Sequence, residues 1–502
     1  MIKSGIARLQ TLGPWRATLL LTLVITLLHL LAAGRVPLSA DEAHYALYGL
    51  HLDWSYFDHP PMVGWMQALV LPFSESEFAL RLWPMALSSA TALLLYGFTQ
   101  RLFPHEHPWL GFWSVAFYQS GLLFQALGLA LVPETPLLFF TLLALLTLLR
   151  ALDHDRWSDW LAFGLCLGLA GLSKYTAVTL ILTTGLFVVL QRRGDVLRMP
   201  KLWMALFLAA LVALLVITPV LYWNAEHDWI SFRYQLGHGF RVKHWEWSRV
   251  GLSQLGQLFG YAPGLYVFGL IALITGAPAW RERGVQLTLL VVVPVLLLFI
   301  SGSGREETLP HWTALAWAGV TPLATRWVLR HRTLRSVRIL LFTSAGYSLL
   351  MLALLYTLLL APTLPFPGSR HPLSPLLGWP EAAARAATLR AEFAREEPEA
   401  VLLVPNWSLA SRLAWYARPL PVQVTDTRFD QFDLWFGTPR VGTDGVLVVP
   451  DVMLKTGRRL LALFETCREA EPYSVVRAGR PVVTFYFFLC RDYRGLDDVP
   501  SP

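Results

Sequence analysis

The chain has 502 residues, of which 55% are hydrophobic and 15% are charged, and its formal net charge is +7. Its mean hydropathy is +0.48. Soluble globular proteins carry about a quarter charged residues, so the composition excludes that class and predicts a polytopic membrane protein. The basic residues stand in short clusters between apolar runs, as in the loops of membrane proteins. Nucleic acid is therefore not expected as a partner.

Eleven apolar segments are long enough to cross a bilayer, which takes about 17 to 25 residues. Two of them are short, because Ser173-Lys174-Tyr175 divides one long apolar stretch. The pattern predicts an all-α polytopic membrane protein. The expected spans are 14–33, 78–100, 109–131, 136–152, 159–174, 176–190, 203–223, 257–277, 285–301, 311–329 and 339–361.

The positions of the lysines and arginines indicate the orientation. The most basic short loops are 191–201, 281–283 and 330–338, and all three face the cytoplasm if the basic N-terminal end does. The loops 34–77 and 224–256 then face outward, together with everything after residue 361. We expect a multi-pass protein of the cell inner membrane with its catalytic face and C-terminal domain in the periplasm. A cleaved signal peptide is the alternative for the first span, but no good cleavage site precedes Asp41.

The last part of the chain changes its pattern. Residues 362–380 form a Pro-rich linker between a membrane domain, 1–361, and a soluble domain, 381–502. In the soluble domain, expected helices at 381–397, 408–417 and 458–470 alternate with expected strands at 400–405, 420–426, 445–451 and 481–490, which is typical of a small α/β domain. Cys467 and Cys490 both fall there and can pair if the compartment is oxidising.

Candidate chemical groups concentrate in residues 38–66. An acceptor hydroxyl needs a base, and Asp41, with its neighbour Glu42, is the first candidate. The structural interpretation is that Ser39 is a helix N-cap and Glu42 completes a capping box three residues later, and both interpretations can hold. Farther along, two prolines stiffen the chain after Asp58-His59, which favours a site over a simple helix stop.

Several basic groups could meet an anionic donor. Lys174 would either snorkel to the membrane surface or bind a lipid phosphate. Arg241 and Lys243 stand in an outer loop rich in aromatic residues, which suits an anionic head group or a solvated surface. Asp58 could join His238, or alternatively His244 or His311, as ligands of a divalent metal, although no H-x-x-x-H spacing supports such a site. We expect no required cofactor, with a divalent metal as the alternative.

The order of short motifs resembles bacterial glycosyltransferase family 39, which includes protein mannosyltransferase-like proteins and lipid A aminoarabinose transferase. The motifs are Asp41-Glu42, Y-x-D-H-P-P, PETP, GLSKYT, PVLYWNAEHDWISFRYQLG and LPHWTA, over most of residues 38–330. The resemblance implies a GT-C fold and inverting transfer of a sugar from a polyprenyl-phosphate carrier on the outer side of the membrane.

The resemblance also implies roles for single residues. Asp41 matches the family's catalytic aspartate and Glu42 its acidic neighbour, while Lys174 matches a lysine taken to bind the donor phosphate. His59 replaces the lysine of aminoarabinose transferases, and Glu134 stands where many relatives have Asp. The expected donor-phosphate residues are His59, Lys174, Arg241 and Lys243, and the expected substrate-binding residues are Tyr45, Asp58, Tyr56, Glu134 and His311.

The sequence therefore predicts a membrane glycosyltransferase with a lipid-linked sugar donor and an envelope acceptor, lipid A or another glycolipid. A protein O-mannosyltransferase is the alternative within enzymes. A polyprenyl-lipid or sugar transporter is less favoured, because transporters place ionisable groups near the bilayer midplane, whereas here they gather at one face.

Overall fold

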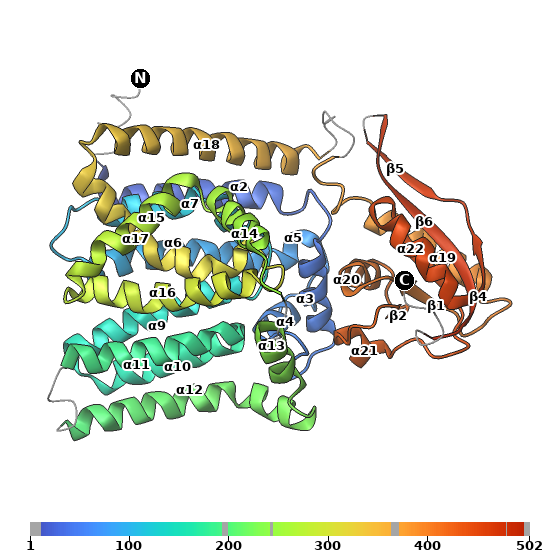
Figure 1. Cartoon of the computed structure of the whole chain (residues 1–502), viewed down its shortest axis with the longest axis horizontal. Helices are drawn as coiled ribbons and strands as arrows, with labels where there is room; N and C mark the ends of the chain where they lie inside the picture. The colour runs from blue at the N-terminus through green and yellow to red at the C-terminus, as the bar shows by residue number, and fades with distance from the viewer. Residues whose placement is uncertain (1–11, 193–198, 241–243, 363–370, 478, 496–502) are drawn as a thin grey trace. The chain divides into compact units, whose positions relative to one another are not determined.

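The structure is a computed structural model that describes residues 12–192, 199–240, 244–362, 371–477 and 479–495 (Figure 1). It divides into two compact units. The first unit comprises Met1–Leu30, His59–Val63 and Arg81–Leu355, and the second comprises Leu31–Asp58, Gly64–Leu80 and Tyr356–Pro502.

The first unit is helical, and its long helices lie alongside one another in Figure 1. Its helices within the described residues are α2 (Pro14–Ala32), α6 (Leu82–Leu102), α7 (Leu110–Gln119), α8 (Leu122–Leu129), α9 (Glu134–His154), α10 (Trp157–Ser173), η1 (Tyr175–Ala177), α11 (Val178–Arg192), α12 (Pro200–Glu226), α13 (Ile230–Phe240), α14 (Trp247–Gly260), α15 (Pro263–Gly276), η3 (Ala277–Ala279), α16 (Arg283–Ser303), η4 (Pro310–Thr313), α17 (Ala314–His331) and α18 (Arg335–Leu360).

The expected number of eleven spans is not confirmed. Within the described part of the chain, seven helices are long and apolar enough to cross a membrane, and the pair α14 and α15, bent by 111°, would make an eighth. The expected span 109–131 is broken at Ser120-Gly121 into α7 and α8, of 10 and 8 residues. Hydropathy averaged over this segment does not detect the break, because both halves are apolar.

Small residues bring α10 and α12 close together. A Cβ atom on Gly168 would lie 2.7 Å from the Cβ atom of Val216, and one on Gly164 would collide with the backbone of Ala209. Glycines at such positions let two membrane helices pack backbone to backbone. This packing matters for the site because α10 ends at Ser173, directly before Lys174.

The second unit contains a six-stranded mixed sheet of order β2-β1-β3-β6-β4, with β5 also paired to β6. β1 is parallel to β2 and β3, whereas β6 is antiparallel to its neighbours. The strands are β1 (Val401–Val404), β2 (Val422–Val424), β3 (Gly445–Pro450), β4 (Phe464–Glu469), β5 (Tyr473–Arg477) and β6 (Arg480–Tyr493). The small C-terminal α/β fold is therefore confirmed.

The helices of this unit carry the segments that matter below. They are α3 (Ala40–Leu50), α4 (Met62–Ala68, whose first two residues belong to the first unit), α5 (Glu77–Leu80), α19 (Trp379–Phe393), α20 (Trp407–Tyr416), α21 (Gln431–Phe436), η5 (Asp451–Met453), α22 (Leu454–Leu460) and η6 (Leu461–Leu463). Leu38, Ala43 and Leu47 share one apolar core with Leu409 and Leu413 of α20. The compact unit thus includes α3 as well as the expected domain 381–502.

One predicted element of this unit is wrong. Residues 458–470 were expected to form a helix, but α22 ends at Leu460 and β4 begins at Phe464. The register pairs Cys467 of β4 directly with Cys490 of β6, and the ladder overrides the helical appearance of the local sequence. The short strand β5 was not predicted. Within the expected linker 362–380, residues 363–370 lie outside the described residues.

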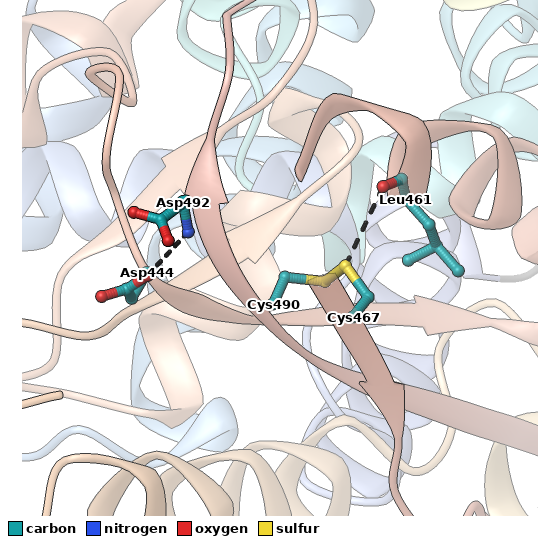
Figure 2. Close-up of a disulfide and its surroundings, with 5 residues drawn as sticks. All are labelled: Asp444, Leu461, Cys467, Cys490 and Asp492. Carbon is teal, nitrogen blue, oxygen red and sulfur yellow. Dashed lines mark hydrogen bonds between the residues drawn. A yellow bond between two sulfur atoms is a disulfide. The ribbon is translucent and has the colours of Figure 1, made fainter. Parts of the chain in front are cut away.

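The predicted disulfide between Cys467 and Cys490 is present (Figure 2). Beside it, the backbone N–H of Asp492 donates a hydrogen bond of 2.8 Å to Oδ1 of Asp444, which joins the end of β6 to the residue before β3. Together these links fasten the two antiparallel strands to the rest of the sheet. Cys166, a free cysteine, is buried.

Candidate active site

The first unit contains a buried ion pair between Lys174 Nζ and Glu134 Oε1. Only 7% of Lys174 and 2% of Glu134 is exposed. His311 Nε2 lies 3.8 Å from the same Glu134 oxygen. Breaking a buried pair by removing one partner costs about 3–5 kcal/mol, because the other charge is left without compensation. These two side chains therefore depend on each other for their charged states.

Local sequence explains how each partner reaches this position. Glu134 begins α9 between Pro133 and Pro136, where a negative charge is favourable because it faces the positive end of the helix dipole. Lys174 stands where α10 stops, in an extended conformation with φ −158° and ψ 142°. The short η4 brings in His311 and Trp312, and Lys174 Nζ lies 5.6 Å from the centre of the Trp312 ring.

His59, the residue that departs from the family pattern, is electrostatically coupled to Glu134. The first unit therefore brings together His59, Glu134, Lys174 and His311, one from each of four motifs. Two of these residues were expected to bind the donor phosphate and two to bind substrate. Sequence reasoning missed Tyr261, which is fully buried, is coupled to Glu134, and donates a hydrogen bond of 3.0 Å to the carbonyl oxygen of Pro310. No motif marks Tyr261.

The second unit contains α3, which carries Asp41 and Glu42. Ser39 is the N-cap of α3, and the predicted capping box is confirmed: Glu42 N donates to Ser39 Oγ (3.3 Å), and Ser39 N donates to Glu42 Oε2 (2.9 Å). Glu42 is buried, whereas Asp41 is partly exposed. The Glu42 carboxylate thus completes the capping box at the start of α3, and Asp41 lies in the same first turn.

Asp58 lies against two residues of α3. The Tyr48 hydroxyl donates to Asp58 Oδ1, and His44 Nε2 lies 3.7 Å from the same oxygen. Burial raises the pKa of Tyr48 well above its usual value, and the Asp58 carboxylate raises it further. Tyr48 therefore stays protonated and acts as a hydrogen-bond donor to Asp58.

The expected substrate-binding tyrosines, Tyr45 and Tyr56, both pack against Tyr48. Tyr56 is fully buried, stacks on Tyr48 with ring centres 3.6 Å apart, and donates to the carbonyl oxygen of Tyr48 (2.7 Å). Tyr45 is buried as well, and its ring lies 5.5 Å from that of Tyr48. The structure thus shows both tyrosines packing around Tyr48.

His44 is the second residue that sequence reasoning missed. It is 2% exposed, and its Nδ1 lies 3.1 Å from Ser411 Oγ of α20. Rings of Trp407, Phe432 and Trp435 surround it. Ser411 is 367 positions away in the chain, so no local pattern could have indicated this contact.

Three expected residues cannot be placed. Arg241 and Lys243 lie outside the described residues, and the same holds for the side chain of His238 near the end of α13. Within the described residues, no three His, Cys, Asp or Glu side chains form a group that could hold a metal ion. The expected pairing of Asp58 with His238 at a metal stays a prediction.

A cavity of about 780 Å³ lies elsewhere in the second unit, beside the starts of β1 and β3. Its lining includes Glu397, Glu399, Asp433 and Asp444, and none of the expected site residues. We do not include it in the candidate site.

Known proteins resemble this chain both in sequence and in fold. Residues 58–223 match the family model described as dolichyl-phosphate-mannose-protein mannosyltransferase. The chain is 27% identical over 321 residues to the lipid A galacturonosyltransferase RgtD of Rhizobium johnstonii, and the match covers 62% of this chain. It spans 64% of that relative's length, just under two thirds.

Among solved structures, ArnT from Cupriavidus metallidurans is similar both in its apo state and bound to undecaprenyl phosphate. In each case the TM-score is 0.58 and the identity 16%, over 93% of this chain and 97% of ArnT. The oligosaccharyltransferase of Archaeoglobus fulgidus is similar with a TM-score of 0.50 and 13% identity, over 88% of this chain and 70% of that protein. These findings confirm the resemblance to family 39 glycosyltransferases.

Proposed function

We propose that this chain is an integral membrane glycosyltransferase that moves one sugar from a polyprenyl-phosphate monosaccharide to lipid A or another envelope glycolipid. The observation that supports this most is the buried cluster of Lys174, Glu134 and His311, with His59 coupled to it. Four short motifs, spread over 250 residues of sequence, supply one member each. A cation held ready by a carboxylate suits a reaction that releases an anionic phosphate.

We assign the donor phosphate to Lys174. In the resting state Glu134 compensates the lysine charge. The phosphodiester of the donor carries one negative charge, as the carboxylate does, and gains further negative charge as the sugar leaves, so it would compete for the same cation, and the Trp312 face would remain beside it. His59 would add a second donor when protonated, and Arg241 and Lys243 are the further candidates for this role.

We assign the base to Asp41. The acceptor hydroxyl attacks the anomeric carbon, the bond from that carbon to the phosphate oxygen breaks, and the hydroxyl proton passes to the Asp41 carboxylate. One displacement inverts the anomeric centre. The Glu42 carboxylate accepts a hydrogen bond from Ser39 N at the start of α3, and it would thereby hold the helix turn that carries Asp41. A metal is not required for this route, and a divalent ion at Asp58 is the alternative.

The acceptor and the membrane face are proposed on two grounds. RgtD acts on lipid A, as its name states, so lipid A is the first acceptor to test. The disulfide of Cys467 with Cys490 supports an oxidising compartment for the C-terminal domain. This agrees with an inner-membrane protein whose C-terminal domain faces the periplasm. A protein O-mannosyltransferase is the second candidate, because residues 58–223 match a family model of that description.

The test is a transfer assay with the purified protein in lipid vesicles. Undecaprenyl-phosphate sugars would be offered with lipid A in one reaction and with a Ser/Thr-rich peptide in another, and products would be identified by mass spectrometry. Sugar on lipid A supports the proposal, and sugar on the peptide alone supports the mannosyltransferase. Movement of the carrier lipid across the vesicle without any transfer would replace the enzyme with a transporter.

A further inference from the structure

Helix α20 of the second unit packs against α3 through an ordered set of contacts. Near the start of α3, the backbone N–H of Leu38 donates to the Tyr416 hydroxyl (2.8 Å). One and a half turns along, His44 Nδ1 meets Ser411 Oγ (3.1 Å). The two contacts run in opposite directions along the chain. The segment from Leu38 to His44, which includes Asp41, therefore lies along the segment of α20 from Tyr416 to Ser411, which includes Arg412.

Arg412 is an unusual residue for such a position. Its side chain is buried, with 8% of the residue exposed. Within the described residues, no carboxylate oxygen forms an ion pair with its guanidinium nitrogens at 4.0 Å or less. Its Nε donates to the carbonyl oxygen of Ser408 (3.2 Å), and Nη1 donates to that of Pro375. The guanidinium carbon lies 4.4 Å from the centre of the Trp379 ring. The cation is thus held rigidly by neutral groups.

The charge of Arg412 acts on Asp41. Burial lowers the pKa of Arg412 to about 10, and the strongest influence that opposes this shift is the Asp41 carboxylate, followed by Tyr416. A Coulomb interaction is mutual, so the same cation stabilises the ionised form of Asp41. A carboxylate that is partly removed from water otherwise tends toward its neutral form, which cannot accept a proton.

We propose that Arg412 is a positioning residue for Asp41: its buried guanidinium keeps the Asp41 carboxylate ionised, and the contact of Ser411 with His44 keeps α20 in register with α3. The inference rests on the proposed function, because it takes Asp41 as the base. Arg412 transfers no proton itself. It makes residues 381–502 part of the catalytic apparatus, although none of the motifs of the family resemblance lies in those residues.

The test compares the pH profiles of kcat/KM for Arg412→Gln, Arg412→Lys and Trp379→Phe. Removing the cation should move the acidic limb of the profile to higher pH by about one unit, the low end of the range for loss of a nearby opposite charge. Lysine should restore the limb. Trp379→Phe loses the hydrogen bond that the indole N–H donates to the carbonyl oxygen of Pro375 (3.2 Å), and it keeps an aromatic ring beside Arg412. This variant should therefore leave the acidic limb unmoved.

Each outcome decides between positioning and packing. An unmoved limb in Arg412→Gln would show that Arg412 only clamps the segment at Pro375, and would overturn the inference. If Arg412→Gln does not fold, Arg412→Met, which keeps the length of the side chain and removes the cation, takes its place: a limb shifted to higher pH supports the inference, and an unmoved limb contradicts it.

The same assay separates this inference from the proposed function. Wild-type protein without transfer, or Asp41→Asn with nearly full transfer, would refute the function or the base assignment, whatever Arg412 does. Asp41→Asn without activity, together with an unmoved limb in Arg412→Gln, would refute only the role of Arg412.

Discussion

The two groups of candidate residues are built in different ways. In the first unit, Lys174, Glu134 and His311 come from three segments and meet as buried charges. In the second unit, Asp41 and Glu42 share one helix turn that a local capping box defines, and α20 then adds contacts to that helix. The first group forms only when distant segments pack together. The second group begins with a capping box between residues three positions apart, which the sequence alone indicates. Mutations should therefore affect the first group mainly through charge balance and the second through chemistry.

The largest effect is expected at Asp41. Asp41→Asn keeps the size of the side chain and removes the proton acceptor, so transfer should fall by about 10²–10⁴, with little change in melting temperature. Glu42→Gln is the matched control: glutamine can still accept from Ser39 N in the capping box, so activity should be largely kept. A folded Asp41→Asn that retains more than about a tenth of the activity would shift the search for the base to Asp58.

Lys174 tests the charge balance of the first group. Lys174→Met leaves Glu134 buried without its partner, and we expect a loss of stability of about 3–5 kcal/mol together with loss of donor use. The double variant Lys174→Met/Glu134→Gln removes both charges and should recover most of the stability without recovering transfer. Thermal unfolding and donor kinetics of the wild type, Lys174→Met, Glu134→Gln and the double variant measure both quantities. Recovered transfer in the double variant would make Lys174 a structural residue.

The disulfide affects the second unit alone. Cys467→Ser removes a link that closes a loop of 23 residues, and a loop of this size corresponds to about 3 kcal/mol. We expect a lower melting temperature for the C-terminal sheet, with the kinetics of donor use unchanged at low temperature. Alkylation of unreduced wild-type protein should find one free thiol, Cys166. Two additional free thiols would contradict both the pairing and the oxidising compartment.

Asp430 should give the smallest effect, through pH. Burial raises the pKa of this carboxyl to about 7, and Asp433 raises it further. Because the folded state holds the proton more tightly than the unfolded chain, the contribution to stability is complete below pH about 4 and is lost as pH rises toward about 7. Asp430→Asn keeps the N-cap of α21 and should flatten this dependence, with a gain of about 1–2 kcal/mol at neutral pH. Identical unfolding curves over this pH range for both proteins would contradict the shift.

Local chemistry in the sequence determined much of this protein. Apolar runs predicted a helical membrane protein, the spacing of Ser39 and Glu42 predicted the capping box, and short apolar segments predicted β1, β2, β3 and β6. The resemblance also indicated His59, Glu134, Lys174 and His311 as single site residues, without indicating their contacts. These features could be predicted because each depends on groups within a few positions of one another, or on a resemblance that includes their order.

The tertiary structure decided the rest. It broke the apolar segment 109–131 at Ser120-Gly121 and made residues 464–469 a strand, because the ladder with β6 outweighed a weak helical preference. It paired Lys174 with Glu134 across 40 positions, and His44 with Ser411 across 367. Such pairings depend on which elements pack together, and a buried polar group takes whichever partner that packing supplies, so no local pattern in the chain could have named them.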